Sequence, residues 1–175
     1  MDTRVACSRH SMIEHFATKE KPFHFTDSGL DNVYLVGIKY FTCECGAISA
    51  EIPALKQLMQ LIACDIVKSQ SNLTGDEIRF LRKRLGKKAT EYCKFLALEP
   101  ETLSRIENGK VQASGATETL ARLSYAILSG DPNLRELAVN ILNTLAEALG
   151  VKPEKEKIVL QMSKNHEWSE LPKAA

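Results

Sequence analysis

The chain has 175 residues, of which 44% are hydrophobic and 26% are charged, and its formal net charge at pH 7 is +1. This composition is typical of a soluble globular protein that can bury a real core. We expect a cytoplasmic protein, because no apolar run reaches the roughly 18 residues of a membrane span and residues 1–16 lack the apolar segment of a secretory signal.

Five cysteines are present, at positions 7, 43, 45, 64 and 93. An odd number in a cytoplasmic chain argues against a disulfide framework, so metal binding or simple burial is the better interpretation. Three of these cysteines and three of the four histidines lie within residues 1–52, which sets this segment apart from the rest of the chain.

Residues 1–52 predict a small β-rich module. β-Branched and aromatic residues fill positions 33–36 and 38–42, which indicates two short strands on either side of Gly37. Ile48 and Ile52 fit a further strand before Pro53.

Residues 53–72 predict an amphipathic linker helix. Apolar residues recur there at three- and four-residue spacing, as they do along the buried face of a helix. Cys64 lies beside this stripe, so we interpret it as a core residue of a helix that packs on one of the flanking domains. The stripe comprises Leu55, Leu58, Met59, Leu61, Ile62 and Ile66.

Residues 73–150 predict a domain of five helices, which makes the whole chain mainly α. Thr74 followed three residues later by Glu77 is a capping box, and it opens the first helix. The next two helices are expected near residues 89–96 and 100–107, with a three-residue joint between them.

The last two helices of this domain are strongly amphipathic. One follows Ser114-Gly115 and the other covers residues 131–149, where Asp131 is the expected cap. The wide apolar stripe of the second could pack wholly inside its own domain, or part of it could form a dimer seam. Residues 151–175 remain as a tail, in which residues 158–162 fit one edge strand. The stripes comprise Leu120, Leu123, Ile127 and Leu128 on the first helix, and Leu134, Leu137, Ala138, Ile141, Leu142, Leu145, Ala148 and Leu149 on the second.

Positive charge is concentrated near the start of this helical domain. From Arg79 to Lys94 there are seven basic residues and one acidic residue, a net charge of +6 in a chain whose total is +1. Such a cluster is the electrostatic footprint expected for phosphate binding, although a solvated helix face produces the same pattern.

The second and third helices have the pattern of a helix pair that reads DNA. One helix fits the major groove and the other holds it there, which requires a tight joint such as Ala97-Leu98-Glu99. Glu101 and Arg105 lie one turn apart, so they could contact a cytosine and a guanine or form an ion pair with each other. The outer residues are Glu101, Thr102, Ser104, Arg105 and Asn108, and the inner residues are Tyr92, Cys93, Leu96, Leu98, Leu103 and Ile106.

Residues 81–86 (LRKRLG), 89–91 (ATE) and 99–110 (EPETLSRIENGK) together resemble the Xre/Cro-type helix-turn-helix family. That family consists mostly of dimeric phage-type and bacterial repressors. The resemblance implies that the start of the second helix and the loop after the third hold phosphates, while exposed positions of the third helix touch bases. Carried over to this sequence, it places Lys88, Ala89 and Thr90 at the start of the second helix, Glu101, Thr102 and Arg105 at base-facing positions, and Asn108 and Lys110 in the phosphate-facing loop. We add two residues to those expected to bind DNA: Lys87, as a phosphate contact beside Lys88, and Ser104, on the outer face of the third helix.

A second constellation combines two close pairs of ligand-type residues, Cys7 with His10 and Cys43 with Cys45. One pair precedes a predicted β-hairpin and the other follows it. Four such ligands suit tetrahedral Zn²⁺ in a structural site, and a metal would help so small a module to fold. His15 or His24 could replace one ligand, and without metal the cysteines would be small buried hydrophobic residues.

The order of these parts over residues 1–128 resembles MqsA-type antitoxins with a YgiT-type zinc finger. The resemblance rests on the ligand pairs, residues 34–38 (YLVGI), Gly46, the linker helix and residues 73–78 (LTGDEI). It implies a structural zinc module that can bind a toxin, and a C-terminal domain that dimerises and represses its operon.

These patterns predict a sequence-specific repressor that binds a palindromic double-stranded operator as a homodimer, with a toxin protein as a further partner. The alternative is a protein-interaction module whose helix-turn-helix is degenerate. We do not expect an enzyme, because the sequence lacks a nucleophile elbow, a phosphate loop and a metalloprotease motif, and four protein ligands would close the zinc site.

Overall fold

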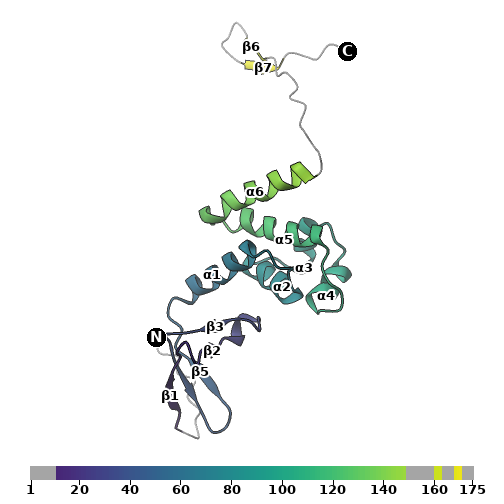
Figure 1. The fold of residues 1–175 in the computed structure, drawn as a ribbon. Coiled ribbons are helices and arrows are strands. Elements are labelled where there is room, and N and C mark those ends of the chain that lie inside the picture. The colour runs from purple at the N-terminus through teal and green to yellow at the C-terminus, as the bar shows by residue number, and fades with distance from the viewer. Residues whose placement is uncertain (1–10, 149–159, 163–167, 171–175) are drawn as a thin grey trace. The chain divides into compact units, whose positions relative to one another are not determined.

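The computed structural model describes residues 11–148, 160–162 and 168–170. A small antiparallel β region is followed by a six-helix domain, so the protein is mainly α, as predicted (Figure 1). The chain divides into two compact units, Met1–Ile141 and Leu142–Ala175. Within the part of the chain that the structure describes, no helix combines the length and apolar character needed to cross a membrane.

The β region contains two antiparallel sheets. In the first, β4 lies between β1 and β5, with Thr42 opposite both Ile13 and Ile48; in the second, β2 pairs with β3. A third sheet, made of the two strands β6 and β7, belongs to the second unit. The strands are β1 (Ile13–Phe16), β2 (Phe23–His24), β3 (Tyr34–Leu35), β4 (Lys39–Thr42), β5 (Ile48–Ala50), β6 (Leu160–Met162) and β7 (Trp168–Glu170), and the 3₁₀ helix η1 is Thr26–Ser28.

The predicted strands around Gly37 are present, but they do not pair with each other. β3 and β4 belong to different sheets, and Gly37 turns between them with a positive φ of 78° while its N–H donates to the carbonyl of Ala17. The partners of both strands, β1 and β2, were not predicted. The four residues of β1 (IEHF) do not alternate apolar with polar, and the two residues of β2 are too few to display a period of two. Long-range pairing therefore determines the topology of this region.

The six helices of the second region begin and end within a few residues of their predicted positions. Thr74 and Glu77 form the predicted capping box, Ser114 accepts a hydrogen bond from the Thr117 N–H, and Asp131 accepts one from the Asn133 N–H. The helices are α1 (Leu55–Lys68), α2 (Gly75–Arg84), α3 (Ala89–Leu96), α4 (Pro100–Glu107), α5 (Gly115–Leu128) and α6 (Pro132–Ala148).

The linker helix α1 packs on the helical domain and contributes to its core. Ala63, Ile66 and Val67 of α1 are buried in the same cluster as residues from α2 to α6, and Cys64 packs against that cluster while remaining partly exposed. A side chain also fixes the C-terminal end of α1 on the domain. Arg122 on α5 donates to the carbonyls of Ser69 and Ser71, each at 2.6 Å, just after the C-terminus of α1.

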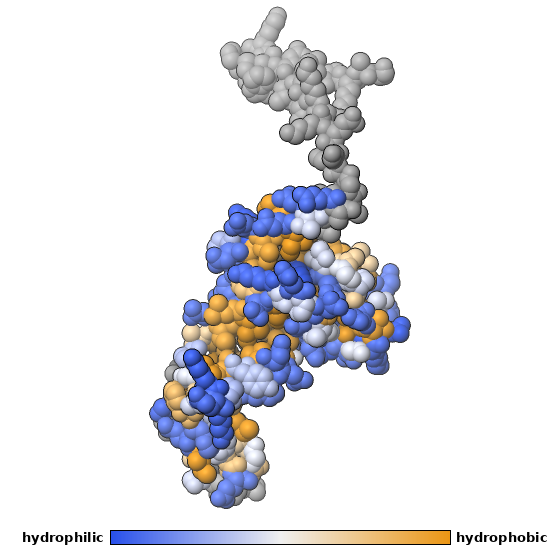
Figure 2. All heavy atoms as spheres, viewed as in Figure 1, coloured by the Kyte–Doolittle hydropathy of each residue, from blue (hydrophilic) through white to orange (hydrophobic). Residues whose placement is uncertain are grey.

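Several apolar residues that we expected inside are at the surface. Ile127 is 56% exposed, and Leu128 and Leu61 are also exposed. The buried residues of α5 are instead mostly small or polar, while Leu120 and Leu123 are partly buried against the core. These buried residues are Thr117, Glu118, Ala121, Ser124, Tyr125 and Ala126. Figure 2 accordingly shows hydrophobic residues gathered at the surface over α1, α5 and α6.

Candidate nucleic-acid interface

Helices α3 and α4 form the predicted pair with a tight joint. Ala97 adopts a left-handed conformation with φ of 51°, and the Leu98 N–H donates to the Cys93 carbonyl at 3.0 Å. A residue with a Cβ pays roughly 1–2 kcal/mol for this conformation. No glycine in the sequence marks this turn, so only the short length of the segment between the two predicted helices indicates it.

The two faces of the helix pair are as predicted. Side chains expected to face inward are buried, except that Leu98 is half-buried, and all those expected to face outward on α4 are exposed. Among the described residues no ion pair joins Glu101 to Arg105, so the intrahelical pair that we considered is not formed. The exposed residues of the pair are Lys88, Thr90, Glu101, Thr102, Ser104, Arg105 and Asn108, with Lys110 in the loop that follows.

The turn between α2 and α3 is anchored on both sides. Lys87 is half-buried, and its ammonium group lies 5.9 Å from the centre of the Phe95 ring, within reach of a cation–π contact. Its carbonyl accepts a hydrogen bond from Arg82 at 3.1 Å. Lys88 is the N-cap of α3 and makes no side-chain capping hydrogen bond.

A buried ion pair ties α2 to the end of α4. Arg82 donates two hydrogen bonds of 2.7 Å to the two carboxylate oxygens of Glu107. Both groups are largely removed from solvent, with side chains 14% and 8% exposed. The bonds to Glu107 raise the pKa of Arg82 above its ordinary value, because they favour the charged form.

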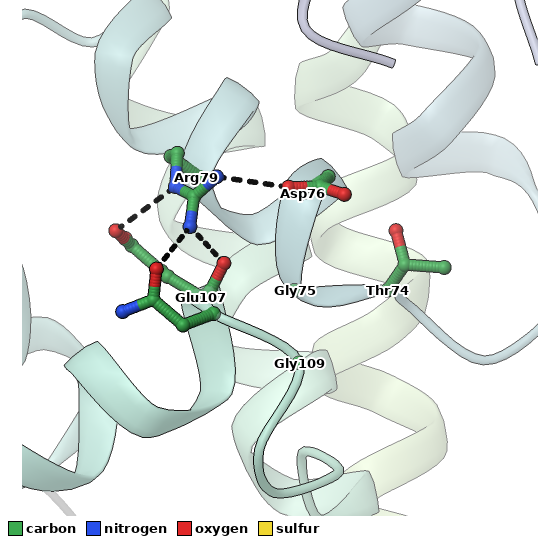
Figure 3. Close-up of a pocket in the computed structure, with 7 residues that line it drawn as sticks. Thr74, Gly75, Asp76, Arg79, Glu107 and Gly109 are labelled. Atoms are coloured by element: carbon green, nitrogen blue, oxygen red, sulfur yellow. Dashed lines mark hydrogen bonds and ion pairs between the residues drawn. The ribbon is translucent and has the colours of Figure 1, made fainter. Parts of the chain in front are cut away.

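A second arginine, Arg79, contacts the same end of α4 (Figure 3). Arg79 donates to Asp76 at 2.9 Å and to Asn108 Oδ1 at 3.1 Å, and it also donates to the main-chain carbonyl of Glu107. These residues line a pocket of about 370 Å³, together with Thr74, Gly75 and Gly109.

The close fit of α2 on α4 requires glycine at position 75. A Cβ built there would lie 2.0 Å from the main-chain oxygen of Ile106, far inside van der Waals contact. Since Gly75 opens α2 and Arg79 lies four residues later, both are on the face of α2 that meets the end of α4.

These ion pairs change the interpretation of the basic stretch. Arg79 and Arg82 are two of its seven cations, and both are paired with acidic residues of the helical domain. Exposed positive charge in this stretch comes instead from Lys83, Lys88 and Lys94. Glu107 was missed as a functional residue, although an acidic side chain at a helix C-terminus beside a buried stripe signals a cationic partner.

Half of the predicted zinc site lies within the described residues. The sulfurs of Cys43 and Cys45 are 3.1 Å apart. They lie in the turn that joins β4 to β5, so the pair forms the tip of a hairpin. The prediction that this pair follows a hairpin is therefore wrong. Cys7 and His10 lie outside the described residues.

The alternative ligands are engaged elsewhere. His15 Nε2 is 2.8 Å from Thr42 Oγ1, and His24 Nε2 is 2.8 Å from the Asp31 carbonyl oxygen. Among the described residues there is no group of three or more His, Cys, Asp or Glu side chains placed to hold a metal. Zinc therefore stays a prediction from the sequence.

The helix pair and the ion pairs behind it are local features, and a fold by itself does not define a function. Comparison with known proteins adds no identity, since no family model, curated protein or solved structure matches this chain.

Proposed function

We propose that the protein is a sequence-specific DNA-binding regulator that reads the major groove with α4. The observation that carries the proposal is the outer face of α4, where Glu101, Thr102, Ser104 and Arg105 are all exposed while Leu103 and Ile106 are buried behind them. Such polar side chains can form hydrogen bonds with base edges, and a helix fits the major groove. The contacts of Arg79 and Arg82 with the end of α4 support this function, because they fix α4 on α2 and base recognition needs a fixed register.

Phosphate contacts would come from both sides of α4. Lys88 and Thr90 lie at the exposed start of α3, where uncapped N–H groups and the positive end of the helix dipole favour an anion. Lys110 is exposed in the loop after α4. Lysines placed on both sides of a reading helix would orient it on the duplex without selecting sequence.

We further propose that the regulator is a homodimer on a palindromic operator. Ile127 and Leu128 on α5 and Val139 on α6 are exposed although they are large and apolar, and their burial between two copies would favour association. Two reading helices would then contact half-sites about one helical turn apart.

An antitoxin role is a second candidate, favoured by the surface of the β region. Ile13 and Ile48 are 56% and 63% exposed, and both lie opposite Thr42 in the three-stranded sheet, so they share one face. An exposed apolar face of this kind fits a protein partner such as a toxin.

The test is binding of the full-length protein to duplex DNA from upstream of its own gene, compared with a scrambled duplex over a series of salt concentrations. We expect preferential binding whose logarithm falls linearly with the logarithm of salt concentration. Exchanging both Lys88 and Lys110 for Gln should reduce that slope by about two, whereas Lys19→Gln, in the exposed part of the β region, should leave it unchanged. A folded protein that binds neither duplex at low salt would refute the proposal.

A further inference from the structure

We infer that Arg79 is a positioning residue of this DNA-reading surface, and that Asn108 orients the loop after α4 instead of contacting DNA. This inference rests on the proposed function, and it names which members of the basic stretch and of the loop do not bind phosphate. It contrasts with the sequence pattern, in which Arg79 belongs to the phosphate footprint and Asn108 to the phosphate-facing loop.

All three guanidinium nitrogens of Arg79 have partners inside the protein. Nη1 donates to Asp76, Nη2 donates to the Glu107 carbonyl and to Asn108 Oδ1, and Nε lies 3.6 Å from the Glu107 carboxylate. The side chain is 29% exposed. A phosphate could bind Arg79 only by displacing these contacts, and the planar fork of arginine suits them better than a lysine ammonium would.

Both ends of the Asn108 side chain are engaged as well. Its Nδ2 donates to the Ser104 carbonyl at 2.7 Å, while its Oδ1 accepts from Arg79 at 3.1 Å. The donor and acceptor therefore face opposite directions, and Arg79 determines the orientation of the amide. Asn108 thus connects α2 to the last turn of α4.

The main chain of the loop is closed in the same way. The N–H groups of Asn108, Gly109 and Lys110 donate to the carbonyls of Ser104, Ile106 and Arg105, at 3.1, 2.9 and 2.8 Å. Gly109 makes this possible with a φ of 67°, as in helix ends that close with a left-handed residue. Because these N–H groups are used internally, Lys110 contributes to phosphate binding through its side chain. Arg79 and Asn108 hold in place the loop that carries this side chain.

The experiment compares Arg79→Lys and Arg79→Gln with two further variants, Lys19→Gln in the exposed part of the β region and Lys110→Gln in the loop. Each full-length protein is titrated, over a series of salt concentrations, with a duplex that the wild type selects from a random-sequence library. Both Arg79 variants should bind roughly ten-fold more weakly, the effect of one lost charge-assisted hydrogen bond, with an unchanged salt slope. Lys110→Gln should lower the slope by about 0.9, and Lys19→Gln should behave as wild type.

Amide hydrogen exchange of the DNA-free proteins gives a second readout. In both Arg79 variants, exchange should become faster at Asn108, Gly109 and Lys110 while the amides of α5 keep their wild-type rates. Uniformly faster exchange would overturn the inference, because it would show a general loss of stability. Arg79→Lys with wild-type affinity, together with Arg79→Gln at a reduced slope, would also overturn it, because Arg79 would then be a phosphate contact. If the wild type selects no duplex, the proposed function fails, and exchange alone decides whether Arg79 orients the loop.

Discussion

The ion pair between Arg82 and Glu107 should be among the most sensitive points of the helical domain. The perturbation is Glu107→Ala, which removes both 2.7 Å hydrogen bonds and leaves the Arg82 guanidinium without its acidic partner. The arginine cannot simply return to water, since its side chain is only 14% exposed. The loss is therefore that of an uncompensated buried charge, in addition to two hydrogen bonds.

Removing one partner of a buried ion pair typically costs about 3–5 kcal/mol, a large part of the 5–15 kcal/mol by which natural domains are stable. Replacing both partners with apolar residues of similar volume, as in a variant with Arg82→Met and Glu107→Leu, should recover most of this loss because no charge is left buried. The double variant should therefore be more stable than the single variant, although it carries one more substitution.

The assay is urea denaturation followed by circular dichroism, with equal m-values required before stabilities are compared. Glu136→Ala, at an exposed position on α6, is the matched control and should change stability by less than about 0.5 kcal/mol. A loss below about 1 kcal/mol for Glu107→Ala, or a double variant no more stable than the single one, would refute this account of the ion pair.

Three further predictions concern packing, protonation and recognition. Gly75→Ala should lower stability by about 1–3 kcal/mol, because its methyl group would collide with the Ile106 carbonyl. Gly115→Ala, with open space around it, should not lower stability. Thermal melting compares the two variants, and equal melting temperatures would contradict the close contact. Burial raises the pKa of Tyr92 from 10.0 to about 12, so between these values the folded protein keeps a proton that the unfolded chain releases, and stability falls as pH rises. Tyr92→Phe should reduce the fall of the urea midpoint with pH over this range. An unchanged dependence of the midpoint on pH would count against the burial argument. Arg105→Ala should cost roughly 1–3 kcal/mol of DNA affinity and relax specificity at one base pair in a selection experiment, whereas an equal loss on every sequence would make Arg105 a phosphate contact.

Features that depend on neighbouring residues could be predicted from the sequence. The capping box of Thr74 and Glu77, the end of α4 at Asn108-Gly109 and the start of α6 at Asp131 were all located correctly. In each case the chemistry joins residues within a few positions of one another, such as a side-chain oxygen and the N–H groups of the next turn. The helical spacing of apolar residues also distinguished the buried face of α4 from its exposed face.

The partners of charged and apolar side chains could not be predicted in this way. Glu107 lies 25 residues beyond Arg82, and nothing in the spacing shows that α2 crosses the end of α4 closely enough to pair them. The basic stretch therefore looked like an uninterrupted phosphate footprint. Likewise, Ile127 fitted an apolar stripe, but the packing of α5 through Ala121 and Ser124 leaves it exposed.

Where the helices begin and end, that the chain is mainly α, and which face of α4 is polar could thus all be predicted, because these features follow from local hydrogen bonds and the helical period. Only the folded chain shows that Arg79 and Arg82 are held inside the domain, that Cys43 and Cys45 meet at a hairpin tip, and which apolar residues reach the surface. These features could not be predicted because a charge, a thiol or an apolar side chain is stabilised by the groups that the fold brings beside it, and residues distant in sequence supply many of those groups.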